Sequence, residues 1–314
     1  MSNSETHRTH LSIVTYVVLT FAFSCVSYWG IIRRGSLSAH GGLLVYTLMW
    51  SPGVAGLLTR LIFQGNLRGH GWGWGKTKYQ FASYWIPLAY AAVVYVPLWL
   101  AGFGNFHAPA VAQYSEVMAR RGLPSWTGVA AYFLMLATWG MFFSCTRALG
   151  EELGWRGFLV PQLAKVMSFR GVALTSGVIW SLWHYPIILF STYRGAGPRW
   201  YSLLCFTVMV IGISFLFAWM RLKTGSVWTG MLLHASHNIF IQGFFDPLTR
   251  PALATKYLIG EFGAGLAIVA VVIAVIFDKK CGQLPALREP EPMTQPVATA
   301  QPGISEGASR PARP

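Results

Sequence analysis

The sequence predicts an all-α fold, a polytopic helical bundle in a membrane with about eight transmembrane helices. Of its 314 residues, 54% are hydrophobic and only 11% are charged, whereas a soluble domain carries roughly 25% charged residues. Aromatic residues make up 15% and include 14 Trp, as is typical of proteins anchored at two membrane interfaces. The third observation is a succession of apolar segments near the ~20 residues needed to cross a bilayer.

These segments divide the chain into three regions. A short N-terminal arm (1–10) precedes a transmembrane domain (11–278), and a Pro-rich C-terminal tail (279–314) without periodicity is predicted to be disordered. The first apolar segment is too long for the core of a signal peptide, so it is counted as a span. The predicted spans are residues 11–32, 42–63, 81–103, 128–150, 172–192, 201–220, 226–245 and 257–277.

Charge predicts the orientation of the chain. The formal net charge is +14, but the basic residues lie between apolar runs, which argues against nucleic-acid binding and for contact with anionic lipid. Eight spans put both termini on one side, where Lys and Arg are about twice as frequent as on the other. We therefore expect both termini in the cytoplasm, in a plasma membrane of the bacterial type. The four cysteines have neither metal-ligand nor redox spacing.

Acidic residues are rare in the apolar region, which makes an adjacent pair of glutamates notable. Of the five acids in residues 11–277, three are expected in loops or near a helix start: Glu116, Asp246 and Glu261. The other two, Glu151 and Glu152, follow a long apolar run. Ionisable residues inside a membrane face the bundle interior and are candidates for function. The simpler interpretation is an interfacial helix end, with the acids paired to Arg147 and Arg156.

Three histidines also lie in otherwise apolar segments: His184 in WSLWH, and His234 and His237 in HASHN. Trp180 and His184 are four residues apart, as are His234 and Asn238, so each pair shares a helix face. Taken singly, each residue has a simpler interpretation. His184 could be a core histidine bonded to a backbone carbonyl, Asn238 an interhelical hydrogen-bonding group, and His237 a spare polar residue. Together they indicate a buried polar site.

Spacing separates the roles of the two glutamates. Glu152 and Arg156 are four residues apart with the acid first, the favourable order for a helical ion pair. Glu151 is offset from Glu152 by about 100° around the helix. One carboxylate can therefore be held by Arg156 while the other faces a cavity.

Depth predicts where the fourth helix ends. If the fifth segment starts near residue 172, His184 lies about 12 residues, or about 18 Å, below the surface. Glu151 can reach that depth only if its helix continues past residue 150 and through Arg156, so we expect the helix to break before Pro161. A cavity open to the cytoplasm would then combine four side chains: Glu151, His184, His234 and Asn238.

These groups favour hydrolysis. The chain has no nucleophile-elbow serine and no His-Glu-x-x-His motif. A buried carboxylate beside an imidazole can activate water as a general base. A second imidazole with an amide can donate hydrogen bonds to a developing oxyanion. The set predicts a hydrolase that acts on an amide inside the membrane.

Three short motifs carry a family resemblance: EELGWR (151–156), WSLWH (180–184) and HASHN (234–238). In order and spacing they resemble the E-E-x-x-x-R, aromatic-x-x-x-H and H-x-x-x-N/D signatures of the CPBP intramembrane proteases. This family, also called Abi, includes the CAAX prenyl endopeptidases. The departure is Trp180, where phenylalanine is commonest, a change expected to alter the pocket rather than the chemistry.

The resemblance implies peptide-bond hydrolysis. Glu151, assisted by His184, would polarise the attacking water, while His234 and Asn238 would stabilise the oxyanion. Glu152 would be oriented by Arg156. The catalytic set that the resemblance implies is Glu151, Glu152, His184, His234 and Asn238, supported by Arg156 and Trp180.

No cofactor is expected to be required. The alternative is zinc held by Glu151, His184 and His234, but the metal-free glutamate mechanism is preferred. The expected partners are the lipid bilayer and a peptide or protein substrate at the membrane, and membership of the family does not fix which. The competing class is non-enzymatic, either a scaffold or a proton-coupled transporter that uses the same cluster. A transporter predicts symmetry between two halves, whereas the polar residues here gather in the fourth, fifth and seventh segments.

Overall fold

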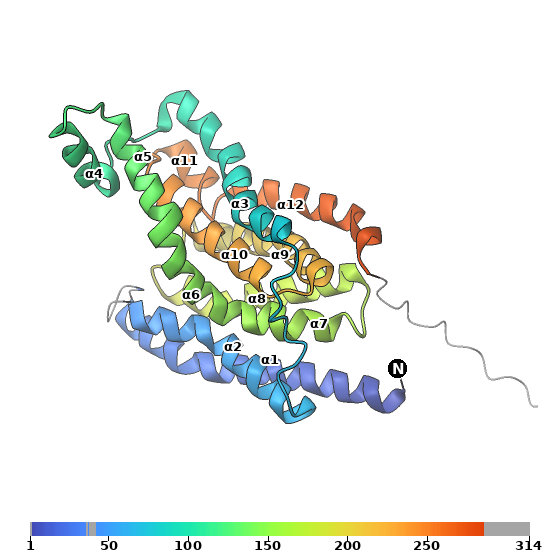
Figure 1. Cartoon of the computed structure of the whole chain (residues 1–314). Helices are drawn as coiled ribbons and strands as arrows, with labels where there is room; N and C mark the ends of the chain where they lie inside the picture. Colours follow the sequence, from blue (N-terminus) through green and yellow to red (C-terminus); the bar gives the residue numbers. More distant parts are fainter. Residues whose placement is uncertain (1, 36, 38–41, 286–314) are drawn as a thin grey trace, which may run out of the picture.

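The computed structural model describes residues 2–35, 37 and 42–285, and over these ranges the chain is helical without a regular β-strand. This confirms the predicted all-α membrane bundle (Figure 1). The α-helices are α1 (Asn3–Arg34), α2 (Leu43–Gln64), α3 (Thr77–Leu98), α4 (Pro109–Ala119), α5 (Trp126–Met135), α6 (Met141–Glu152), α7 (Val160–Leu163), α8 (Phe169–Phe190), α9 (Arg199–Thr224), α10 (Trp228–His237), α11 (Leu253–Leu258) and α12 (Ala264–Lys279). π-Helical segments are η2 (Trp99–Phe103), η3 (Leu136–Gly140), η4 (Leu153–Leu159) and η5 (Asn238–Phe245), and a 3₁₀ turn is η6 (Cys281–Gln283).

Every predicted span contains a helix, but not every helix has the length and hydropathy of a span. Among the described residues, five helices are long and apolar enough to cross a membrane: Asn3–Arg34, Thr77–Phe103, Trp126–Leu163, Phe169–Phe190 and Arg199–Thr224. The other three predicted segments hold α2, α10 with η5, and α11 with α12. α12 has only 16 residues. The count of eight spans therefore stays a prediction.

Both ends of the chain differ in detail from the sequence-based boundaries. α1 begins at Asn3, inside the predicted arm, because Ser2 and Glu5 form a reciprocal capping box around its first turn. At the other end, α12 ends at Lys279 and η6 follows. The tail predicted to be disordered is 279–314: its described part includes the end of α12 and η6, and residues 286–314 lie outside the described residues.

The fourth predicted span belongs to one helical rod from Trp126 to Leu163. The prediction that it runs on through Arg156 is confirmed. The expected break before Pro161 is wrong in position, because Pro161 lies in the first turn of α7, where proline is tolerated. The rod ends two residues later.

The segment between the third and fourth spans contains a helix that the sequence analysis missed. α4 packs against α5 and projects from the bundle (Figure 1). Glu116 lies in α4 and not in a loop, so that expectation is wrong. A proline at the start of the helix is the local signal that was overlooked.

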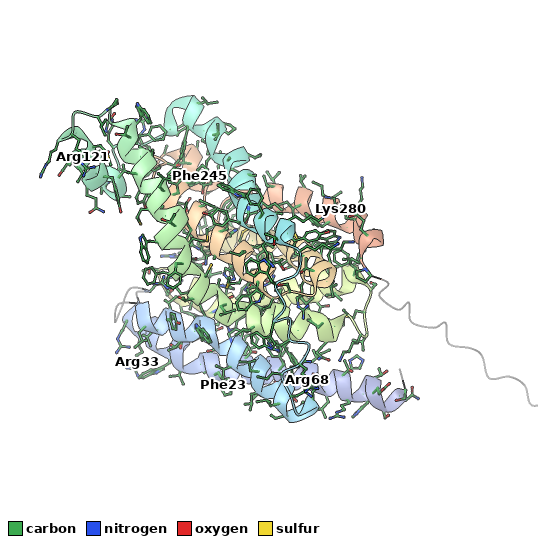
Figure 2. The ribbon with its side chains drawn as sticks, viewed as in Figure 1. Phe23, Arg33, Arg68, Arg121, Phe245 and Lys280 are labelled. Carbon is green, nitrogen blue, oxygen red and sulfur yellow. The ribbon has the colours of Figure 1, made fainter. Side chains whose placement is uncertain are left out.

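The bundle has two faces, which we call terminal and distal. The terminal face carries the N-terminus, the loops 65–76, 164–168 and 225–227, and the end of α12, where Arg170 pairs with Asp278. The distal face carries the loops 99–125, 191–198 and 246–263, where Tyr193 donates a hydrogen bond to Glu261. Figure 2 labels basic residues at both faces: Lys280 and Arg68 near the terminal one, Arg33 and Arg121 near the distal one.

Glycines bring α2 into backbone contact with α6 and η4. A Cβ atom on Gly53 would lie 2.3 Å from the Gly150 carbonyl oxygen, and one on Gly154 would lie 2.4 Å from the Pro52 carbonyl oxygen. Small residues allow such close approach of membrane helices. The contact fixes the height and rotation of α6 immediately before Glu151.

We predict that Gly53→Ala destabilises the protein by about 1–3 kcal/mol, because the new methyl group must push the two backbones apart. Thermal unfolding in detergent would measure the loss. Gly243→Ala is the matched control, since its Cβ would meet only Leu136 at an ordinary 3.6 Å. Equal unfolding temperatures for the two variants would contradict the close-packing argument.

Candidate active site

The structure brings the predicted site residues to one buried cavity of about 140 Å³. Glu151 from α6, His184 from α8, His234 from α10 and Asn238 at the start of η5 all line it. The space is sufficient for several water molecules, each of which needs about 30 Å³. Much of the remaining wall is apolar: Leu48, Met49, Ile187, Phe206, Met209, Val210, Ile213 and Phe217.

Glu151 has one carboxylate oxygen fixed and the other directed towards a histidine. Its side chain is buried, and Oε2 accepts hydrogen bonds from the indole Nε1 of Trp155 at 3.2 Å and of Trp180 at 2.9 Å. Oε1 lies 4.0 Å from Nε2 of His234. The two indoles therefore orient the carboxylate, and Oε1 is left for the cavity.

Trp180 adds a hydrogen bond to the site that the sequence analysis did not foresee. That analysis expected a tryptophan at this position to alter the pocket rather than the chemistry, which stays a prediction. Phenylalanine has no N–H group, so only the tryptophan can donate to Glu151. The indole supplies one of the two hydrogen bonds that hold Oε2.

Glu152 is held by Arg156 and does not line the cavity, as the spacing predicted, although both glutamates lie beside His234. Its Oε1 accepts from Arg156 Nη1 at 2.9 Å and from His234 Nδ1 at 2.9 Å. The Arg156 guanidinium lies between the rings of Trp180 and Phe217, 4.2 and 4.1 Å from their centroids. Glu152 thus joins the arginine to the histidine and fixes the orientation of the imidazole ring.

His184 is held by its own helix through one ring nitrogen. Its Nδ1 lies 3.0 Å from the Trp180 carbonyl oxygen, and a carbonyl can only accept, so Nδ1 carries a proton. The ring packs edge-on against Trp183, 4.8 Å between centroids. Nε2 is the ring nitrogen left for a water molecule or a substrate.

A second histidine–carboxylate pair lines the same cavity and was missed by the sequence analysis. His237 Nε2 lies 3.0 Å from Glu261 Oε1, and Tyr193 donates to Glu261 Oε2 at 2.7 Å. Tyr90 is hydrogen-bonded to His237 Nδ1. Glu261 was expected to lie near a helix start, where the helix dipole stabilises an acid, and His237 was expected to be a polar residue without a function. Their pairing joins segments 24 residues apart, and no local spacing signals it.

Asp246, on the distal face, also binds a tyrosine, as Glu261 does. It follows η5, as the loop assignment expected, but its carboxylate accepts a hydrogen bond from Tyr95 of α3. The same Tyr95 hydroxyl accepts from the Gly260 amide at 2.8 Å. These bonds tie the loop that carries Glu261 to α3.

The mouth of the cavity lies on the distal face. Its deepest residues are buried, whereas Gln242 is exposed, and Leu37, Val45 and Tyr193 are half-buried. Val45 is near the distal end of α2 and Gln242 is in the distal half of the α10–η5 helix, whereas Leu37 and Tyr193 follow the distal ends of α1 and α8. The sequence analysis placed both the termini and the cavity opening in the cytoplasm, that is, on the same side of the membrane. In the structure the termini and the mouth are on opposite faces, so the two expectations cannot both hold.

The zinc alternative can be tested on the donor set. Among the described residues, no three His, Cys, Asp or Glu side chains converge closely enough to hold a metal ion. Glu151, His184 and His234 do not fit a zinc site in this arrangement, so no step below uses a metal.

The fold and the site define a helical membrane protein with a buried glutamate–histidine centre, and two comparisons with known proteins bear on it. Residues 133–240 match the family model described as type II CAAX prenyl endopeptidase Rce1-like. Over 145 residues the chain is 28% identical to CAAX prenyl protease 2 of Methanococcus maripaludis. The aligned region makes up 45% of this chain and 50% of that protein. The chain thus spans about half the length of this curated relative.

The matched segment contains all three motifs and therefore the glutamates, His184, His234 and Asn238. The resemblance stated from the motifs is confirmed, because the matched family model and the relative are both CAAX prenyl endopeptidases, a group that the CPBP family includes.

We predict that Trp180→Phe lowers kcat in a peptide-cleavage assay about tenfold to hundredfold, because a hydrogen bond to a charged group contributes roughly 1.5–3 kcal/mol. Trp183→Phe is the matched control. It also loses an indole N–H at the cavity wall, but that group donates to Ser24 and not to Glu151. A similar loss in both variants would show that ring size matters and that the bond to Glu151 does not.

Proposed function

We propose that this protein is an intramembrane endopeptidase that hydrolyses a peptide bond with water activated by Glu151 and His184. The observation that carries the proposal is the orientation of Glu151. Two indole N–H groups hold Oε2, which leaves Oε1 at the cavity beside His234. A carboxylate fixed in this way can accept a proton from water with little reorganisation.

The reaction follows from the protons that each group can carry. A water molecule between Glu151 Oε1 and His184 Nε2 gives its proton to Oε1 as its oxygen attacks the carbonyl carbon. His234, protonated on both nitrogens, donates Nδ1–H to Glu152 and Nε2–H to the new oxyanion, with the Asn238 amide as second donor. When the C–N bond breaks, the proton on Glu151 passes to the leaving nitrogen, and an acid and an amine result.

The support for a metal-free mechanism is that, among the described residues, no three His, Cys, Asp or Glu side chains converge closely enough to hold a metal ion. The support for a membrane-associated substrate is the wall of the cavity, which is apolar beside the reacting groups. The name of the relative, CAAX prenyl protease 2, makes prenylated C-terminal peptides the first substrates to test. The non-enzymatic alternatives, a scaffold or a proton-coupled transporter, are not favoured, because the matched family is one of endopeptidases.

We predict that Glu151→Gln in the purified full-length protein lowers cleavage of a peptide library at least about 10²-fold, since the general base is lost. Glu116→Gln removes the charge of an exposed acid in α4 and serves as the matched control. Undiminished cleavage in Glu151→Gln would rule out its catalytic role. Loss of wild-type activity on chelation, with recovery on adding zinc, would overturn the metal-free mechanism.

We also propose that the substrate enters from the distal face. In a cysteine-free background, Cys restored at position 281 on the terminal face and Gln242→Cys at the cavity mouth should react with a membrane-impermeant maleimide from opposite sides. Added peptide substrate should slow labelling of Gln242→Cys and leave Cys281 unaffected. Labelling of both positions from one side would refute distal entry.

A further inference from the structure

The glycine-rich loop NLRGHGWGWGK (66–76) has no place in the three motifs, yet it packs beneath the catalytic glutamates. Its His70 is fully buried, and Nε2 donates a hydrogen bond to the Leu153 carbonyl oxygen at 2.8 Å. The imidazole stacks on Trp72, 5.2 Å between centroids. A Cβ on Gly157 would lie 2.4 Å from His70 Nε2, so a glycine is needed where the ring meets η4.

A buried arginine from α9 reaches the same segment. Arg221 is only 6% exposed, and its Nε donates to the Arg156 carbonyl oxygen at 2.7 Å. Its Nη2 donates to the Gly69 carbonyl oxygen at 3.4 Å, which links it to the loop that carries His70. A guanidinium is costly to bury, and here its acceptors are backbone carbonyls.

Both side chains bind main-chain carbonyls of the π-helical segment η4. This segment shifts the hydrogen-bond register, because the Val160 amide bonds to the Trp155 carbonyl five residues back. π-Helical turns disturb the regular ladder and are frequent at functional sites. Buried carbonyls need partners, and those of Leu153 and Arg156 find them in His70 and Arg221.

The two anchored carbonyls lie next to the residues that orient the site. Leu153 follows Glu152 directly, and the Arg156 side chain holds Glu152 at 2.9 Å. Glu152 in turn holds His234. A shift of the η4 backbone would therefore reach the imidazole through two bonds that are both buried.

We propose that His70 and Arg221 are positioning residues that fix η4, and with it the Glu152–His234 pair, for catalysis. The inference rests on the endopeptidase function proposed above. Burial lowers the pKa of His70 to about 4, so the ring is neutral at physiological pH. It then offers one N–H, which goes to Leu153, while Nδ1 has no partner among the described residues.

The test compares variants that remove the donor with variants that keep it. His70→Leu and Arg221→Met should lower kcat about 10-fold to 100-fold with KM changed less than about twofold, because a misplaced reacting group affects the chemical step. His70→Gln and Arg221→Lys keep an N–H donor and should recover most of kcat. His107→Leu, at an exposed histidine, and Arg170→Met, at an exposed ion pair on the terminal face, are the controls.

A merely structural role predicts a different result. His70→Leu would then give less folded protein, but the folded fraction, separated by size-exclusion chromatography, would keep the wild-type kcat. That outcome, or equal kcat in His70→Leu and His70→Gln, would overturn the inference. If His70→Leu keeps kcat while Glu151→Gln is inactive, only the positioning role falls. If Glu151→Gln is active, the proposed glutamate mechanism falls, and the positioning role falls with it because it rests on that mechanism.

Discussion

The ion pair between Glu152 and Arg156 is the interaction on which the rest of this site depends. Both side chains are almost completely buried, and a buried pair repays its desolvation only when other groups complete its solvation. Here the rings of Trp180 and Phe217 cover the guanidinium, and His234 donates to the same Glu152 Oε1 that binds Arg156, while Glu152 Oε2 and Arg156 Nε have no partner among the described residues. Removal of either partner would leave an uncompensated charge inside an apolar bundle.

The backbone around this pair is arranged to make room for it. Glycines at 53, 150 and 154 bring α2 against the rod that carries the glutamates. A Cβ on Gly230 would lie 2.6 Å from Glu152 Oε2, so α10 also needs a glycine where it passes the carboxylate. Close packing and electrostatics therefore act on the same few turns, those around Glu152. A buried carboxylate can be stabilised there only because the neighbouring helices approach it closely.

Local spacing predicted the part of the site that lies within single helices. The four-residue separations gave the Glu152–Arg156 pair and the divergence of the two glutamates, and the depth of His184 required the helix to continue through Arg156. A family likeness added roles for these residues. These predictions succeeded as geometry because helical periodicity determines which neighbours share a face.

What the sequence could not supply were partners from distant segments. His70 meets Leu153 across 83 residues, and Trp180 meets Glu151 across 29. Glu261 reaches His237 from a loop that has no motif. Such pairings depend on how whole helices tilt and pack. The periodicity of a sequence gives no information about either. The cavity was placed on the wrong face for the same reason, since helix lengths alone do not say which end of a bundle is closed.

The cavity is closed at the terminal face and open at the distal face. The orientation of the chain in the membrane therefore decides which compartment the reacting groups face. On the terminal face, the loop 65–76 and Arg221 close the space beneath η4. On the distal face, Gln242 and Tyr193 lie at the mouth of the cavity. If the basic residues hold the termini in the cytoplasm, the reacting groups face the opposite compartment, and substrates must present their scissile bond from there. If the chain is inserted the other way, the same groups face cytoplasmic peptides, with no change in the chemistry.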